Sequence, residues 1–334
     1  MRNLASSVRV LSAILLLPTL SLWAADKKSD VNEIGNRRVA HRSIISQEKE
    51  IAVGKEIATE IDHSAKVLND PMITEYVNRV GQNIARNSDL TIPLTVKVID
   101  SPEINAFALP GGFLYVNTGL LLAADEEDQV AGVMAHEIAH VAARHWASQM
   151  TKGTLAQLAM IPLMIIPMSY GVYYGVVEAY LNGVPLAFLK FTRSAEAEAD
   201  YLGLQYMYKA GYDPNSYVSF FSKIIEEDRR SPGSIPTVFA SHPPTPDRIL
   251  KSEQEIKEIL PKRDQYLVST SEFDDIKARL QTVISSRRKQ RTESGPTLKK
   301  RETQTDTSTT QTSSGDDKGK DKTEDKPPVL RRRD

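Results

Sequence analysis

The sequence predicts a mostly helical α+β fold with a small antiparallel sheet. Apolar residues recur at helical spacing over most of the chain before residue 285, while strand-like alternation and hairpin turn residues fall within residues 92–119. Hydrophobic residues make up 40% of the 334 residues, enough for one sizeable core in one or two domains. The net charge of −1 gives no support to nucleic-acid binding. The absence of cysteine excludes disulfides, thiolate metal sites, a cysteine nucleophile and a lipid-modified N-terminal cysteine.

The first 25 residues have the pattern of a secretory signal peptide. A basic start precedes an apolar run at 10–23, and the small residues Ala24 and Ala25 follow it. The run is short for a membrane span, which favours cleavage over an uncleaved anchor. We therefore expect an exported protein, periplasmic in a bacterial host, whose mature part begins with a polar segment at 26–42.

The next elements follow from local capping and turn signals. Ser46 is a plausible N-cap for a first helix, and Pro71 suits the first turn of a second. Residues 92–100 alternate as a strand. Residues 105–119 predict a hairpin of two short strands that turns at Pro110, Gly111 and Gly112.

Further helices follow the hairpin. One starts near Asp125, with acidic residues at the positive end of its dipole, and another runs from about Ser194 to the C-terminal glycine Gly211. Residues 213–230 predict one more helix, and the proline-rich stretch "SHPPTPDRI" leads into the next. A C-terminal helix at 263–284 is expected to precede a polar tail.

The helix that starts near Asp125 contains the motif "HEIAH". His136 and His140 are four residues apart, about 40° around the helix axis, so both imidazoles can face one metal ion. Glu137 lies where its carboxylate can take a proton from water bound to that ion. The motif predicts a zinc site with a catalytic function.

His145 does not fit the same face. It is five residues past His140, about 140° around a continuous helix, so its side chain is expected to point away from His136 and His140. We interpret His145 as a structural polar residue. A catalytic zinc has three protein ligands and one open position, so another ligand must come from elsewhere.

The segment "RSAEAEAD" offers carboxylates for that role. Glu196 and Asp200 are four residues apart and share a helix face, whereas Glu198 lies about 200° from Glu196. One carboxylate can bind the metal and a second can hydrogen-bond a ligating histidine. The alternative is an ordinary acidic helix start.

Four motifs in order resemble the gluzincin peptidases of family M48. They are "NAFALPGGFLYVNTGLL", "HEIAH", "EAEAD" at 56 residues after His140, and "SHPPTPDRI", and the resemblance covers roughly residues 43–260. The family includes HtpX-type membrane peptidases, CAAX prenyl peptidases and periplasmic proteases of outer-membrane quality control. This chain lacks the several spans of the prenyl peptidases and the C-terminal helical repeats of some periplasmic members.

The resemblance implies a zincin-like (gluzincin) metallopeptidase domain at 43–262. It implies one zinc ion bound by His136, His140 and Glu196, with Glu137 as the general base. Asp200 matches the family's second acidic residue, which acts either behind the ligands or as a proton donor. The resemblance also implies a mostly helical fold with a small sheet, in which an edge strand at 113–116 binds extended substrate.

"SHPPTPDRI" places His242 before two prolines in a stiff, extended loop, and Arg248 follows near the next helix start. One hypothesis is that His242 donates a hydrogen bond to the negative oxygen of the tetrahedral intermediate and that Arg248 contacts the intermediate or substrate backbone. Another is that His242 fills the open zinc position and holds the enzyme inactive until substrate displaces it. The remaining alternative is a solvated loop histidine.

These observations predict a zinc endopeptidase that cleaves unfolded or misassembled envelope proteins by zinc-activated water. The alternative function is a metal-containing chaperone or adaptor that binds unfolded protein with little or no cleavage. An intact Glu137 argues for the enzyme, because a pure holdase does not need a base.

Two segments outside the motifs complete the prediction. Residues 154–189 are apolar and broken by prolines and glycines, and one membrane crossing there would separate Glu196 from the histidines. We expect a helical hairpin that covers the site or contacts a membrane surface, with plain core packing as the alternative. Residues 285–334 contain no aromatic residue, so they predict a disordered tail that is dispensable for catalysis.

Overall fold

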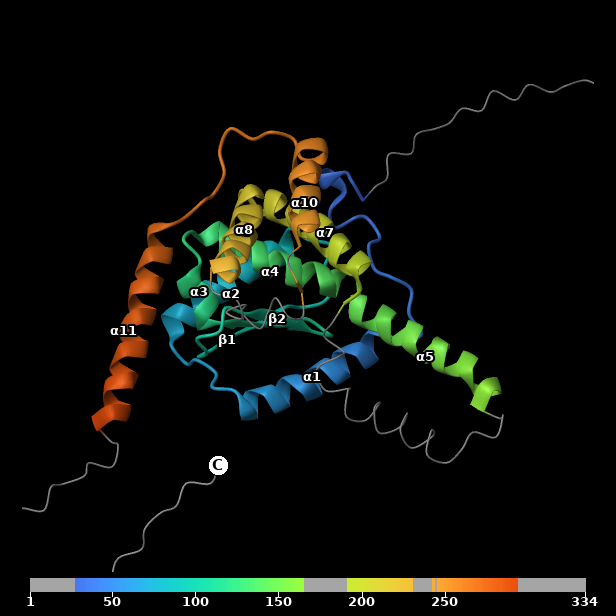
Figure 1. The fold of residues 1–334 in the computed structure, drawn as a ribbon, viewed down its shortest axis with the longest axis horizontal. Coiled ribbons are helices and arrows are strands. Elements are labelled where there is room, and N and C mark those ends of the chain that lie inside the picture. The colour runs from blue at the N-terminus through green and yellow to red at the C-terminus, as the bar shows by residue number, and fades with distance from the viewer. Residues whose placement is uncertain (1–27, 165–190, 231–241, 244, 294–334) are drawn as a thin grey trace, which may run out of the picture. The chain divides into compact units, whose positions relative to one another are not determined.

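The computed structural model describes residues 28–164, 191–230, 242–243 and 245–293. The described elements, in chain order, are a short 3₁₀ helix η1 (Val31–Glu33), α1 (Gln47–Ser64), α2 (Pro71–Arg86), β1 (Thr95–Ile99), β2 (Ala106–Leu109), β3 (Phe113–Asn117), α3 (Thr118–Ala123), α4 (Glu127–Ala142), α5 (His145–Met164), α7 (Arg193–Ala210), α8 (Asn215–Arg230), α10 (Pro246–Ile259) and α11 (Ser271–Glu293) (Figure 1). The described residues up to Arg287 form one compact unit.

The predicted caps are confirmed. Ser46 caps α1 by accepting a hydrogen bond from the Lys49 backbone, and Pro71 opens α2 behind its N-cap Asp70. Gly211 ends α7 with a φ of 98°, in the left-handed region that glycine adopts without strain. Helix boundaries therefore follow from local chemistry where a cap residue is present.

The three described strands form a mixed sheet in the order β1-β3-β2. β2 and β3 make the predicted antiparallel hairpin, whose turn has Gly111 and Gly112 at φ values of 80° and 86°. β1 pairs with β3 in parallel, because the hairpin reverses the chain and returns β3 along the direction of β1. The sheet is thus mixed where the sequence predicts an antiparallel one.

The prediction that residues 113–116 form an edge strand is wrong. They lie in β3, and β1 and β2 pair with its two sides. In the described part of the chain β2 is an edge strand instead, and it packs against α4. Among the described strands, the sheet edge next to the HEIAH helix is therefore β2.

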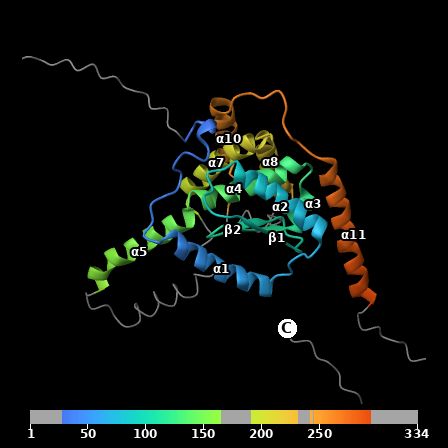
Figure 2. The same cartoon turned by 180° about the vertical axis from the view of Figure 1, so that it is seen from behind.

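Helices cover both faces of the sheet. α1 lies along one face and α4 along the other, as the opposite views show (Figures 1 and 2). Side chains of β3 alternate accordingly: Leu114 and Val116 enter the main core, while Tyr115 faces α1 and donates a hydrogen bond to the Ala58 carbonyl at 3.1 Å. Gly54 of α1 permits this packing, since a Cβ there would stand 1.7 Å from the Pro110 carbonyl oxygen.

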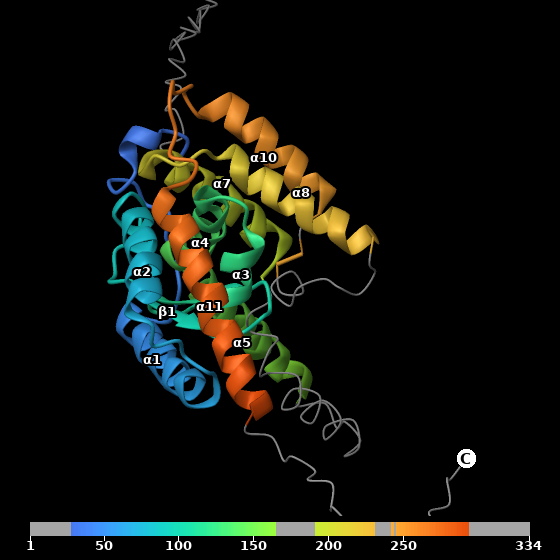
Figure 3. The ribbon, with the colours of Figure 1, turned by 90° about the vertical axis from the view of Figure 1, so that its left-hand side faces the viewer.

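α4 is the central helix, and every one of its residues is buried. α7 packs along it, with Gly203 beside the His136 backbone, where an added Cβ would lie 3.2 Å away. α8 and α10 lie side by side over α7, and α11 runs past α2 (Figure 3). This packing brings the acidic start of α7 against the middle of α4.

α11 continues to Glu293, past residue 285, where composition predicts the polar tail to begin. Phe273, Ile276 and Leu280 bury one side of its first turns in the main core. Among the described helices none is both long and apolar enough to cross a membrane. The expected signal peptide, most of the 154–189 hairpin, and the tail from residue 294 lie outside the described residues.

Candidate metal centre and active site

His136 and His140 meet on the inner face of α4, as the motif predicts. Their Nε2 atoms are 3.1 Å apart, and the two side chains are 2% and 3% exposed. One helical turn separates them, so a single ion can accept both nitrogens. Such deep burial of two imidazoles is costly unless partners satisfy them, and those partners come from α7.

Glu196, in the first turn of α7, completes the ligand set. Its Oε2 lies 3.5 Å from His136 Nε2, and its Oε1 lies 3.6 Å from His140 Nε2. Ligands at about 2.0 to 2.1 Å from a tetrahedral zinc stand about 3.3 Å from one another, so these separations fit one ion. Glu196 Oε2 is buried and its near neighbours are cationic or ligand nitrogens, with Arg248 Nη1 at 3.1 Å and His136 Nε2 at 3.5 Å, so a carboxylate oxygen faces the candidate metal position.

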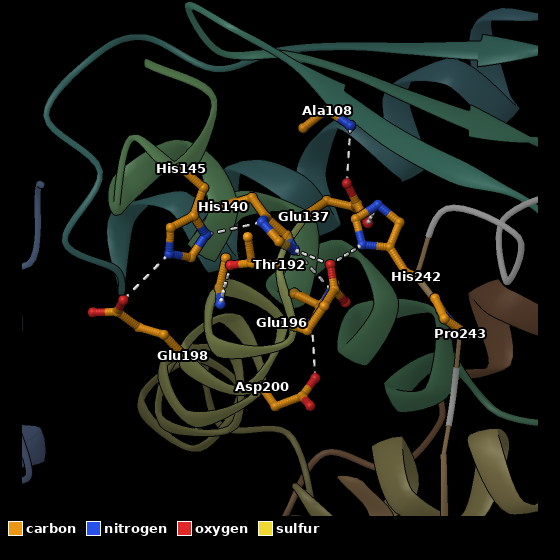
Figure 4. Close-up of polar contacts among 12 residues, drawn as sticks. Ala108, Glu137, His140, His145, Thr192, Glu196, Glu198, Asp200, His242 and Pro243 are labelled. Atoms are coloured by element: carbon orange, nitrogen blue, oxygen red, sulfur yellow. Dashed lines mark hydrogen bonds and ion pairs between the residues drawn. The ribbon is translucent and has the colours of Figure 1, made fainter. Parts of the chain in front are cut away.

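His242 joins the same group. Its side chain is buried, its Nδ1 lies 2.8 Å from Glu196 Oε1, and each residue of the set His136, His140, Glu196 and His242 offers a ligand atom within 4.8 Å of the others (Figure 4). The interpretation of His242 as a solvated loop residue is therefore wrong. The His242 imidazole is buried beside Glu196 instead of being exposed to solvent.

Glu137 points from α4 toward the sheet. Its Oε2 accepts a hydrogen bond of 3.0 Å from the backbone N–H of Ala108 in β2, and its Oε1 lies 3.9 Å from His242 Nε2 (Figure 4). The side chain is 2% exposed. The candidate base is thus fixed between the metal ligands and the edge strand.

A second group of side chains supports His136. Asp200, one turn beyond Glu196 on α7, places Oδ1 3.0 Å from His136 Nδ1. Arg248 donates to both Asp200 oxygens, at 2.7 and 2.6 Å, in the two-pronged geometry typical of guanidinium and carboxylate. Tyr217 of α8 donates to Asp200 and lies 3.2 Å from His136 Nδ1. Sequence reasoning missed Tyr217, because an aromatic residue at helical spacing looks like core.

The prediction that the His145 side chain points away from His136 and His140 is wrong. Its Nδ1 lies 2.9 Å from His140 Nδ1, and its Nε2 lies 3.3 Å from Glu198 Oε2. The angular argument assumed one continuous helix, but α4 ends at Ala142 and Arg144 has a φ of 56°. The break changes the direction of the chain, so the His145 side chain contacts the Nδ1 side of the candidate ligand His140. It is still outside the catalytic metal group.

Ionisation in the cluster suits metal binding. Burial alone raises the pKa of Glu196, but hydrogen bonds to His136 and His242 outweigh it and hold the pKa well below its ordinary value. Burial also raises the pKa of Asp200, but hydrogen bonds to Arg248 and His136 outweigh this effect and lower that pKa below its ordinary value. Burial, then the charges of His136 and His242, lowers the pKa of His140. The carboxylates are thus ionised and His140 is neutral at pH 7, as ligands must be.

Burial lowers the pKa of His136, but hydrogen bonds to Asp200 and Glu196 raise it to about 9. A bound cation competes with that proton, so metal binding at His136 releases it.

A cavity of about 400 Å³ opens beside Glu196. Its lining includes Phe191, Arg193, Arg248 and Lys251. Phe191 also stacks on His140 at 4.1 Å between ring centroids, which shields that ligand from solvent. The cluster of candidate metal ligands is therefore accessible from one side, next to the apolar ring of Phe191.

A helix-borne HEIAH motif, a glutamate ligand from a second helix and an edge strand beside the base define a metallopeptidase-type centre of the gluzincin class. The chain belongs to Peptidase family M48, whose model matches residues 71–256.

The chain is also similar to proteins that are named as proteases. The chain is 28% identical over 291 residues to the beta-barrel assembly-enhancing protease of Escherichia coli (strain K12), covering 85% of this chain and 58% of that protein. It is 32% identical over 234 residues to the mitochondrial metalloendopeptidase OMA1 of Schizosaccharomyces pombe, covering 69% and 67%. The chain thus spans a little over half the length of the bacterial relative.

Proposed function

We propose that this protein is a zinc-dependent endopeptidase that hydrolyses unfolded or misassembled envelope proteins. One observation above all supports this: Glu137 lies beside the three candidate zinc ligands and is hydrogen-bonded to the edge strand β2. A base held between a metal group and a strand edge is what peptide hydrolysis requires.

Substrate binds in extended form along β2. Ala108 directs its N–H to Glu137, away from β3, and the neighbouring Asn105 carbonyl accepts from Asn117 of β3. Because backbone groups alternate sides along a strand, Ala106 and Ala108 both face away from β3. Ala106 is fully buried and Ala108 is partly exposed, so the accessible part of this edge lies at Ala108. An added strand there passes next to Glu137, so backbone pairing selects unfolded chains over folded ones.

His136, His140 and Glu196 would hold the zinc ion. When bound, zinc polarises the scissile carbonyl and lowers the pKa of a bound water to about 7. Glu137 accepts the proton of the attacking water and passes it to the leaving amine. No covalent intermediate with the protein is required.

Asp200 and Arg248 act by positioning. The Asp200 carboxylate faces His136 Nδ1 and fixes the tautomer that leaves Nε2 free for the metal. Arg248 neutralises Asp200 and has Nη1 3.1 Å from Glu196 Oε2. These contacts favour the role behind the ligands over proton donation for Asp200, and a positioning role over contact with the intermediate for Arg248.

The position of His242 favours the inhibitory ligand over the hydrogen-bond donor. Its imidazole lies among the candidate ligand atoms, so it would be the fourth protein ligand at a zinc ion that otherwise keeps that position for water. Substrate entering along β2 displaces it, so the peptidase stays inactive until an unfolded chain arrives. The donor role remains the second candidate and predicts the opposite mutational effect.

The proposal also includes export of the protein and cleavage of envelope substrates. They are supported by the signal-peptide pattern of residues 1–25 and by similarity to proteases named for β-barrel assembly. A metal-containing chaperone without cleavage is the rival function. Glu137 discriminates between them, because binding alone does not need a buried carboxylate beside the metal group.

The decisive experiment compares the wild type with Glu137→Gln. Zinc content is measured on the purified proteins, and cleavage is followed on an unfolded protein such as reduced casein. We expect Glu137→Gln to retain as much zinc as the wild type and to lose cleavage by at least about 10²-fold. Equal cleavage by both proteins rejects the peptidase mechanism, and no cleavage by the wild type together with tight binding of the unfolded protein supports the chaperone.

A further inference from the structure

A second group of metal-ligating side chains lies behind His140. His41 Nε2 is 2.6 Å from Glu198 Oε2, and His145 Nε2 is 3.3 Å from the same oxygen. Each of the three residues offers a ligand atom within 4.8 Å of the others. Figure 4 shows Glu198 reaching toward His145, on the opposite side of His140 from Glu196. The proposed peptidase mechanism does not use this group.

We propose that His41, His145 and Glu198 form a second site for a divalent transition-metal cation such as Zn²⁺. Two imidazole nitrogens and one carboxylate oxygen are the donor set that zinc takes in peptidase centres. The separations of Glu198 Oε2 from the two nitrogens need a shift of less than 1 Å to match a tetrahedral ion. The second oxygen of Glu198 stays with Lys28, whose Nζ lies 3.0 Å away.

The site is open to solvent on one side. A cavity of about 410 Å³ borders all three candidate ligands, and the His41 side chain is 36% exposed. An ion can therefore enter, and water can complete its coordination. Lys28 and Lys152 add positive charge nearby, so we expect binding weaker than at the buried catalytic site.

Filling the second site opposes filling of the first. If His140 binds zinc through Nε2, its Nδ1 carries a proton and donates to His145 Nδ1, 2.9 Å away. A metal on His145 Nε2 moves the remaining imidazole proton of His145 to Nδ1, so two donors then face each other. The hydrogen bond is lost or one proton leaves. Excess zinc is therefore expected to disturb His140 and to inhibit.

The stoichiometry of the full chain tests the site. Zn²⁺ bound at equilibrium is measured by dialysis against buffered free zinc, for the wild type, His41→Ala and His63→Ala. His63 is an exposed histidine of α1 and serves as the matched control. We expect two zinc ions in the wild type and in His63→Ala, and one in His41→Ala. A single ion in the wild type at saturation, or two in His41→Ala, overturns the proposal.

Glu198→Gln gives an independent check, because it removes the carboxylate and leaves His41 in place. It is also expected to bind one ion, and retention of two contradicts the site. For the coupling, cleavage is followed as zinc rises above one equivalent. We expect the wild type to lose activity by about tenfold and His41→Ala to keep it; equal inhibition of both overturns the coupling. The binding measurement stands whether or not the protein is a peptidase.

Discussion

The backbone N–H of Ala108 donates a 3.0 Å hydrogen bond to the carboxylate of Glu137. This contact ties the edge strand to the HEIAH helix, and in the proposed mechanism it sets the register between a bound peptide and the base. Residues far apart in sequence are thereby fixed in one geometry, and the predictions below depend on that geometry and on the packing behind it.

The contact between β2 and the candidate base predicts that Ala108→Pro lowers activity. The Ala108 N–H faces away from β3 and donates to Glu137, and proline is tolerated on an edge strand at such a position. Loss of this hydrogen bond should lower kcat/KM about 5- to 10-fold. Ala108→Ser keeps the N–H and is the control, with thermal melts showing that both variants fold. Unchanged kcat/KM in Ala108→Pro would rule out a role for this contact.

His145 is predicted to strengthen zinc binding at the catalytic site. Its Nδ1 lies 2.9 Å from His140 Nδ1, and by accepting a hydrogen bond there it would fix the tautomer that presents His140 Nε2 to the metal. His145→Phe retains an aromatic ring without an acceptor and should weaken zinc affinity about 10- to 100-fold. His145→Gln, which keeps an acceptor, should lose less. Competition with a chelator measures both, and wild-type affinity in His145→Phe would show that the contact has no such role.

His242→Ala separates the two functions considered for His242. If the imidazole blocks the open zinc position, its removal should raise kcat/KM on an unfolded substrate about 3- to 10-fold, with zinc retained by three ligands. If it donates to the intermediate, kcat should fall about 10²-fold. Steady-state kinetics on metal-loaded protein decides, and unchanged values would remove His242 from the mechanism.

We expect the unfolding free energy to depend on pH through Asp128, which lies at the start of α4. The residue is fully buried, and burial raises its pKa from 3.8 to about 7, although Ser216 donates to it. Between these values the folded state binds more protons than the unfolded one. The contribution of Asp128 to the unfolding free energy therefore falls as pH rises from about 4 to 7, by at most about 4 kcal/mol.

Asp128→Asn does not titrate, so the variant should gain at most about 3 kcal/mol relative to the wild type between pH 5 and pH 8. Urea unfolding at the two pH values measures this gain. A difference between the two proteins that stays constant with pH would mean that Asp128 has an ordinary pKa in the folded chain.

Local signals account for what the sequence by itself determined. The caps at Ser46 and Gly211, the hairpin glycines and the four-residue spacing of His136 and His140 act within one or two helical turns. Their outcome therefore follows from neighbouring residues. The choice of Glu196 rested on the resemblance to a family, since Glu196, Glu198 and Asp200 are chemically similar ligands.

Only the tertiary structure decided the rest, because it depends on long-range packing. Contact between α7 and α4 turns Glu196 and Asp200 toward His136 and sends Glu198 to the other side. The break at Arg144 is stabilised by a hydrogen bond to Glu50, a residue of α1, and it brings His145 back to His140. Helical periodicity contains no information about a partner some ninety residues away. The sequence therefore determined which side chains can bind a metal, and packing decided which of them meet.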